Sequence, residues 1–253
     1  MVWRKSRRCP VKKLLGRTTS REFREIFIEA RGAFGKPIKF VEGQKRHESD
    51  PFRQRKGQMS VDATGATIWV DTSLETPYFE TVAAHELCHL LLEHDGFPKA
   101  VWNNTVSPVR VETNRMANAL MVNALADPVV GRRLVERGFP ALRMISEEAD
   151  IGLQRLEEAS ALEEEGEGFN LGAFTYLNIK LTLDDQRVDR YAALLQQKAP
   201  STYRWGEEFA KIALGSGYET PDGNWKAVVE IFERLQLCHV GLEARGRRHA
   251  PRW

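Results

Sequence analysis

The stretch Val82-Ala83-Ala84-His85-Glu86-Leu87-Cys88-His89-Leu90-Leu91-Leu92 places two histidines four residues apart inside an apolar run. In an α-helix, residues four apart project from one face, one turn from each other. Two neutral imidazoles at that spacing can bind one Zn²⁺ at about 2.0–2.1 Å. Glu86 lies on the flank of that face, where a carboxylate can accept a proton from a metal-bound water. The stretch therefore predicts a helix that carries a catalytic zinc site.

The apolar residues of this stretch are spread around the whole helix, which predicts a helix buried on most sides. Two imidazoles and a carboxylate in such a helix would each carry a desolvation cost unless they were paired or metal-bound. The alternative is that His85 and His89 are core histidines hydrogen-bonded to backbone, with Glu86 at the surface. We favour the metal site, because the alternative must account for three polar groups at once.

A catalytic zinc needs a third protein ligand and one open position. The metzincin pattern fails here, because Leu92 stands where that pattern requires Gly. The better candidate is Glu112, at the start of a second predicted helix in which apolar residues recur at helical spacing. The connection over residues 95–108 contains one Gly and two Pro and is predicted to be a loop. The alternative for Glu112 is a first-turn glutamate that only favours the helix dipole.

Two stretches, 68–71 and 79–92, resemble the ImmA/IrrE family of metallopeptidases. Glu112-Thr113-Asn114-Arg115-Met116-Ala117 is similar to the second motif of that family, E-x-N-x-(F/M)-A. The resemblance covers residues 38–125 and implies a small gluzincin fold. It also implies zinc ligation by His85, His89 and Glu112, with Glu86 as the general base. The chain departs from the family in having Cys88 where Gly is usual and in lacking a Pro near Asn123.

We expect an α+β fold in which a small zincin-like core precedes an all-helical C-terminal half. The core would hold a short antiparallel or mixed sheet from the runs 37–41, 58–62 and 66–71, together with the HExxH helix and the second ligand helix. An exposed edge of that sheet could add an extended peptide as another strand. Helical periodicity recurs over 171–183, 187–198, 203–214 and 225–237. The expected divisions are a basic segment 1–17, the metallopeptidase core 18–127, a helical region 128–242 and a basic tail 243–253.

Composition bounds the function only loosely. The formal net charge of +2 indicates no class of partner. Basic residues gather at three places, which we interpret as solvated rather than as a nucleic-acid surface. The three clusters are Arg4, Lys5, Arg7, Arg8, Lys12, Lys13 and Arg17; Lys45, Arg46, Arg53, Arg55 and Lys56; and Arg245, Arg247, Arg248 and Arg252. Three widely spaced cysteines do not suggest a disulfide framework, and Cys88 is interpreted as a small core residue. No apolar run has the length of a signal peptide or of a membrane span, so we expect a cytoplasmic protein without a membrane partner.

These observations predict a zinc-dependent endopeptidase that cuts a specific intracellular protein. The same ligands would also accept Mn²⁺ or another divalent ion. The family resemblance implies that the substrate is often a DNA-binding repressor on a separate chain. Tyr78, His94 and Arg115 could stabilise an oxyanion, although a plain surface role is preferred for each. The alternative function is a nucleic-acid-associated protein whose metal site is structural or degenerate.

Overall fold

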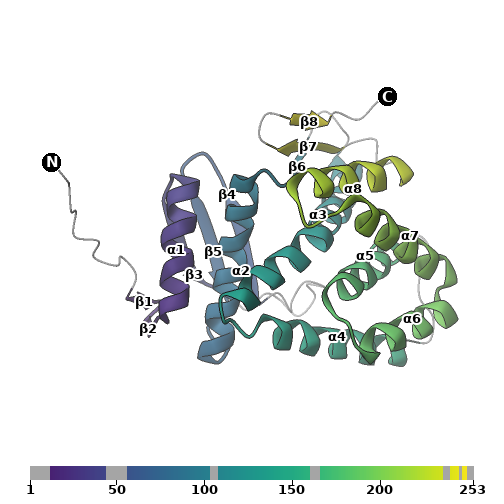
Figure 1. Ribbon diagram of the computed structural model, residues 1–253, viewed down its shortest axis with the longest axis horizontal. Helices are drawn as coiled ribbons and strands as arrows, with labels where there is room; N and C mark the ends of the chain where they lie inside the picture. The colour runs from purple at the N-terminus through teal and green to yellow at the C-terminus, as the bar shows by residue number, and fades with distance from the viewer. Residues whose placement is uncertain are drawn as a thin grey trace. The chain divides into compact units, whose positions relative to one another are not determined.

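The computed structural model describes residues 12–43, 56–102, 108–159, 166–235, 240–244 and 247–249. Within these ranges, the side chains of residues 100–102, 108–121, 166–171, 240, 241 and 249 are not described. The fold is α+β, as predicted, with eight helices and three small sheets among the described residues (Figure 1). It divides into two compact units, residues 1–91 with 133–140 and residues 92–132 with 141–253. In the described part of the chain, no helix is long and apolar enough to cross a membrane.

A mixed three-stranded sheet organises the first unit. Its order is β3 (Ile38–Glu42), β5 (Ala66–Val70) and β4 (Gly57–Val61). β4 and β5 form an antiparallel hairpin, and β3 pairs with β5 in parallel. Asp62 closes the hairpin turn, because its Oδ1 accepts hydrogen bonds from the Thr64 N–H at 2.6 Å and the Gly65 N–H at 3.0 Å. The predicted short sheet is therefore confirmed as a mixed one, with a tight turn between the runs 58–62 and 66–71.

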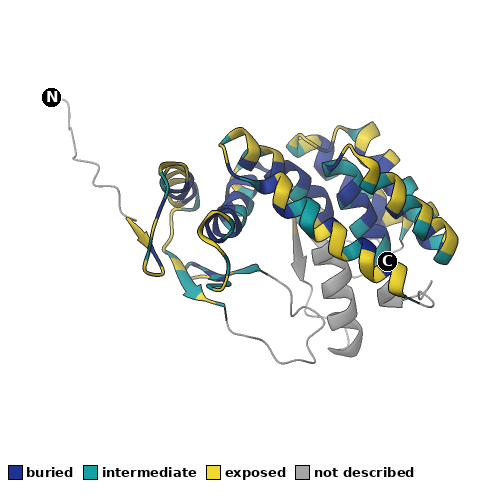
Figure 2. Ribbon diagram, turned by 90° about the horizontal axis from the view of Figure 1, so that it is seen from below, coloured by how far each residue is buried: buried dark blue, intermediate teal, exposed yellow. Residues whose placement is uncertain are grey.

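Helices α1 (Arg21–Phe34) and α2 (Thr76–Asp95) cover one face of this sheet (Figure 2). The Phe40 ring of β3 lies 6.0 Å from the Phe23 ring and 5.9 Å from the Phe27 ring of α1, measured between centroids. Phe40 is in register with the fully buried Ile68 of β5, so both side chains face the helices. The core of this unit lies between the sheet and the two helices.

A short hairpin of β1 (Lys13–Leu14) and β2 (Arg17–Thr18) anchors the start of α2. The Arg17 guanidinium donates hydrogen bonds to the carbonyls of Thr72 at 2.5 Å and Leu74 at 2.6 Å. The same guanidinium lies 4.7 Å from the centre of the Phe79 ring. These contacts hold the loop that leads from β5 into α2, so they help to fix where α2 begins.

The second unit is mainly helical, as predicted. Its helices are most of α3 (Pro108–Glu136), with α4 (Ala141–Glu158), α5 (Gly166–Thr182), α6 (Gln186–Lys198), α7 (Pro200–Ser216) and α8 (Pro221–Arg234). Pro200 and Pro221 stand in the first turns of their helices, where no backbone N–H is needed. A core cluster joins α4, α5 and α6: Ala149, Leu153, Leu156, Tyr176, Ile179, Leu183, Tyr191, Leu195 and Ala199. α7 packs against α5, α6 and α8.

A second three-stranded sheet in this unit departs from the sequence prediction. β6 (Lys99–Trp102) lies within the connection that we expected to be a loop. It pairs antiparallel with β7 (Val240–Ala244), which in turn pairs with β8 (Arg247–His249). The expected helical region therefore ends in a strand, and the basic tail contributes β8. Short strands whose partner lies far along the chain carry little local signal, which is why the periodicity did not reveal them.

Candidate metal centre

The middle of α2 is buried except at the three residues of the predicted site. Between Phe79 and Leu92, every residue is buried apart from His85, Glu86 and His89, which are half-buried. This confirms the prediction of a helix buried on most sides. The three side chains thus form one partly exposed stripe on an otherwise buried stretch of the helix.

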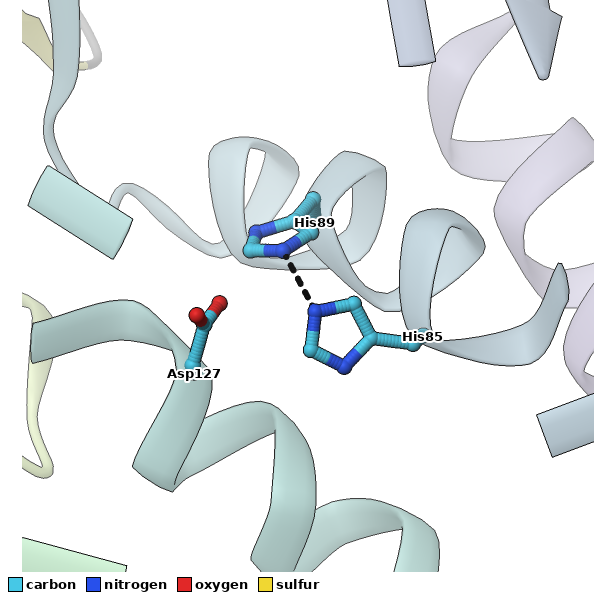
Figure 3. A group of neighbouring side chains, drawn as sticks. All are labelled: His85, His89 and Asp127. Atoms are coloured by element: carbon cyan, nitrogen blue, oxygen red, sulfur yellow. Dashed lines mark hydrogen bonds between the residues drawn. The ribbon is translucent and has the colours of Figure 1, made fainter. Parts of the chain in front are cut away.

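The two imidazoles of this stripe face each other. The Nε2 atoms of His85 and His89 lie 3.1 Å apart (Figure 3). Their rings are nearly perpendicular, at an interplanar angle of 73° with centroids 4.8 Å apart. Two nitrogens bound tetrahedrally to one zinc at about 2.05 Å would be separated by about 3.3 Å. The helix therefore brings the two predicted ligand atoms almost to the spacing that a shared metal requires.

The same distance also fits a hydrogen bond between two neutral imidazoles, one donating its Nε2–H and the other accepting. Two imidazoles that bind one metal ion have nearly the same spacing. A histidine pair with a purely structural role would, however, have no need of a carboxylate beside it. The position of Glu86 is therefore the feature that favours a reactive site.

Glu86 lies against the start of the edge strand β4. A Cβ built on Gly57 would lie 3.2 Å from Glu86 Oε1 and 3.5 Å from Glu86 Cγ. The carboxylate thus lies directly beside the backbone of β4, on the helix that also carries both histidines. A carboxylate next to a strand edge is placed where an extended peptide could meet it.

A further carboxylate, from Asp127 of α3, joins the histidines in the structure (Figure 3). Among the described residues, a nitrogen of His85, a nitrogen of His89 and a carboxylate oxygen of Asp127 all lie within 4.8 Å of one another. Carboxylates and imidazoles together form common zinc ligand sets. Asp127 is not among the residues predicted from the sequence. Its only signal there is a lone carboxylate in the otherwise apolar run 124–131, directly before Pro128. In the structure it is the one half-buried residue of that run.

Glu112, the predicted third ligand, belongs to α3, but its side chain lies outside the described part of the structure. Its role therefore stays a prediction. The same holds for Arg115, one of the three oxyanion candidates. Of the other two, Tyr78 is half-buried in the first turn of α2 and His94 is exposed in its last turn.

Cys88 is fully buried on α2. Burial raises the pKa of its thiol to about 12. A thiol in this environment stays protonated at neutral pH and is a poor nucleophile and metal ligand. The sequence-based interpretation of Cys88 as a small core residue agrees with both findings.

Comparisons with known proteins add no family assignment. No family model matches the chain, and searches of curated proteins and of solved structures find no match.

Proposed function

We propose that this protein is a zinc-dependent endopeptidase that hydrolyses a peptide bond in a specific protein substrate. The observation that carries the proposal is the arrangement on α2: two imidazole nitrogens 3.1 Å apart, with Glu86 between them in sequence and beside a strand edge in space. The motif H-E-x-x-H, the burial of the rest of the helix and the resemblance to the ImmA/IrrE family all support it.

The proposed ligands are His85, His89 and a carboxylate of α3. The sequence motif favours Glu112 for the third position, and the proximity of Asp127 makes it the alternative. With zinc bound, such a ligand set would supply an activated water as nucleophile and a positive charge that polarises the substrate carbonyl. Mn²⁺ or another divalent ion would suit the same ligands.

Glu86 acts as the general base in this proposal. Its carboxylate takes a proton from the attacking water as the new C–O bond forms at the peptide carbonyl. The proton then passes to the leaving amine nitrogen as the C–N bond breaks. The products are a carboxylic acid and an amine, so no co-reactant other than water is needed.

The edge of β4 supports an extended peptide as the substrate. The Asp71 N–H bonds to the Lys56 carbonyl and the Asp62 N–H to the Gly65 carbonyl, each at 2.9 Å. Because hydrogen-bonded positions alternate along an antiparallel pair, residues 58 and 60 also face β5, and residues 57, 59 and 61 face away from it. Among the described residues, no strand occupies that outer edge of β4. A substrate strand could pair with Gly57 and Met59 there, next to Glu86.

The resemblance suggests a DNA-binding repressor as the substrate, on a separate chain. Most residues of the three basic clusters lie outside the described part of the structure, so the alternative of a nucleic-acid-associated protein has no structural observation in its favour. The mainly helical second unit is proposed to select or position the partner.

The test uses the full chain loaded with zinc and a peptide library made by digesting a whole proteome, with new termini read by mass spectrometry. Glu86→Gln is the matched control, because it keeps the shape of the side chain while removing the base. We expect defined cleavages by the wild type and a loss of about 100-fold or more in Glu86→Gln at equal zinc content. Equal cleavage by both proteins would contradict the proposal, and so would tight DNA binding with no cleavage of peptides or of candidate repressors.

A further inference from the structure

Gly57 is the first residue of β4, and its backbone lies against Val82 and Glu86 of α2. A Cβ at this position would lie 2.5 Å from Val82 Cγ1, which is closer than such atoms approach in proteins. Val82 is buried, at 4% exposure, and its β-branched side chain has few rotamers to which it could move. Any residue other than glycine would therefore push β4 and α2 apart.

Glu86 is the second neighbour of this position. Its Oε1 would lie 3.2 Å from the same Cβ, and its Cγ 3.5 Å. Val82 and Glu86 are four residues apart and so share one face of α2. The missing side chain at residue 57 thus lets the backbone of β4 lie directly against the carboxylate of the proposed general base.

The backbone polar groups of Gly57 point toward the side of β4 on which a substrate peptide would pair. Gly57 lies opposite Val70 of β5 at a position where the two residues exchange no hydrogen bonds, because the bonded positions of β4 are 56, 58, 60 and 62. On the other side of β5, the Val70 carbonyl accepts from the Gly43 N–H at 2.7 Å, which agrees with this alternation. The N–H and carbonyl of Gly57 therefore point to the outer edge of the sheet.

We infer that Gly57 is a positioning residue for the proposed peptidase: its lack of a side chain sets the distance between the substrate-binding edge of β4 and Glu86. A peptide that pairs with Gly57 would then hold its scissile carbonyl within reach of the base and the metal. The inference rests on the proposed function. It adds a residue that positions the substrate-binding edge of β4 relative to Glu86.

The test compares two inhibitors on the zinc-loaded full chain. Acetohydroxamic acid binds the metal without a peptide, whereas an N-acetylated tripeptide hydroxamate also needs the strand edge. In Gly57→Ala, we expect the affinity for the tripeptide hydroxamate to fall about tenfold or more while that for acetohydroxamic acid changes less than about twofold. Zinc content should equal that of the wild type.

Two further variants separate positioning from packing. Val82→Ala removes the nearer of the two neighbours, so Gly57→Ala/Val82→Ala should regain tripeptide hydroxamate affinity to within about threefold of Val82→Ala alone. Gly206→Ala is the matched control in the second unit, because its Cβ would lie 2.6 Å from Tyr176 Cδ1. It should lower the melting temperature, as Gly57→Ala does, without changing the ratio of the two affinities.

The outcomes are distinct. A wild type that takes up no zinc overturns the proposed function and this inference with it. The role of Gly57 is overturned if the zinc-loaded wild type binds both hydroxamates equally. It is also overturned if Gly57→Ala leaves the ratio of the two affinities unchanged. Neither result contradicts the proposed metal site.

Discussion

His85 Nε2 and His89 Nε2 lie 3.1 Å apart across one turn of α2, in a helix whose other residues from Phe79 to Leu92 are buried, Glu86 excepted. This pair, rather than any single residue, defines the site. Its nitrogens need to separate by only about 0.2 Å to reach the spacing of two tetrahedral zinc ligands.

The third ligand can be assigned by substitution on α3. We expect Glu112→Ala to weaken zinc binding by about 100-fold or more, because a catalytic site loses one of its three protein ligands. Asp127→Ala should weaken it by about tenfold or less, as expected for a carboxylate that only orients an imidazole. Zinc affinity is measured by competition with a chromophoric chelator. The reverse order of effects would assign the ligand to Asp127.

The outer edge of β4 should tolerate proline where the inner edge does not. In Met59→Pro, the lost N–H points away from β5, so the free energy of unfolding should fall by no more than about 1 kcal/mol relative to Met59→Ala. Peptide cleavage should nevertheless be lost, because residue 59 of β4 would no longer have an N–H to donate to the substrate strand. Ser60→Pro breaks a bond to β5 and should cost about 2–3 kcal/mol.

Urea unfolding and the peptide-cleavage assay check this pair of substitutions. If Met59→Pro cleaves as well as Met59→Ala does, peptides do not bind along the edge of β4. If Met59→Pro and Ser60→Pro are equally destabilised, the alternation of hydrogen bonds derived for this strand is wrong.

A partly buried network in the second unit predicts a pH effect on stability. Burial alone would raise the pKa of the Glu207 carboxyl, but hydrogen bonds from Lys180 and Tyr176, with the charge of Lys180, outweigh it and lower that pKa. A lowered folded-state pKa contributes stability that is present above the ordinary value of 4.5 and is lost as pH falls through the folded-state value. The Glu207 side chain is 36% exposed, so screening keeps this contribution small.

Glu207→Gln should therefore destabilise the protein by about 1 kcal/mol at neutral pH. The difference from the wild type should shrink as the pH falls below 4.5. Urea titrations at a series of pH values measure it. A difference that stays constant with pH would show that the charge of Glu207 contributes nothing to stability.

Much of the fold could be predicted because its signals are local. The α2 motif, the hairpin turn at Asp62 and the helices that begin at Pro200 and Pro221 all follow from periodicity or from residues with special backbone preferences. β6 could not be predicted, because it is four residues long and its partner β7 lies far along the chain, at Val240–Ala244. Pairing between such distant segments is decided by tertiary packing rather than by local propensity.

The candidate site likewise contains residues that could be predicted from the sequence and residues that could not. His85, Glu86 and His89 share one helix, so their mutual placement follows from helical geometry and could be predicted from spacing alone. Asp127 lies on another helix, and its proximity to the histidines depends on tertiary structure. The role of Gly57 depends on how closely a strand approaches a helix, a distance that no local pattern encodes.

The central claim is that His85 and His89 share one metal ion, and elemental analysis of the purified full chain tests it most directly. Wild type and His89→Ala are each incubated with zinc, freed of excess metal by gel filtration and compared. The account predicts about one zinc per wild-type chain and less than about a tenth of that in His89→Ala. A wild type that holds no metal after this treatment, or a His89→Ala variant that holds as much as the wild type, would contradict it.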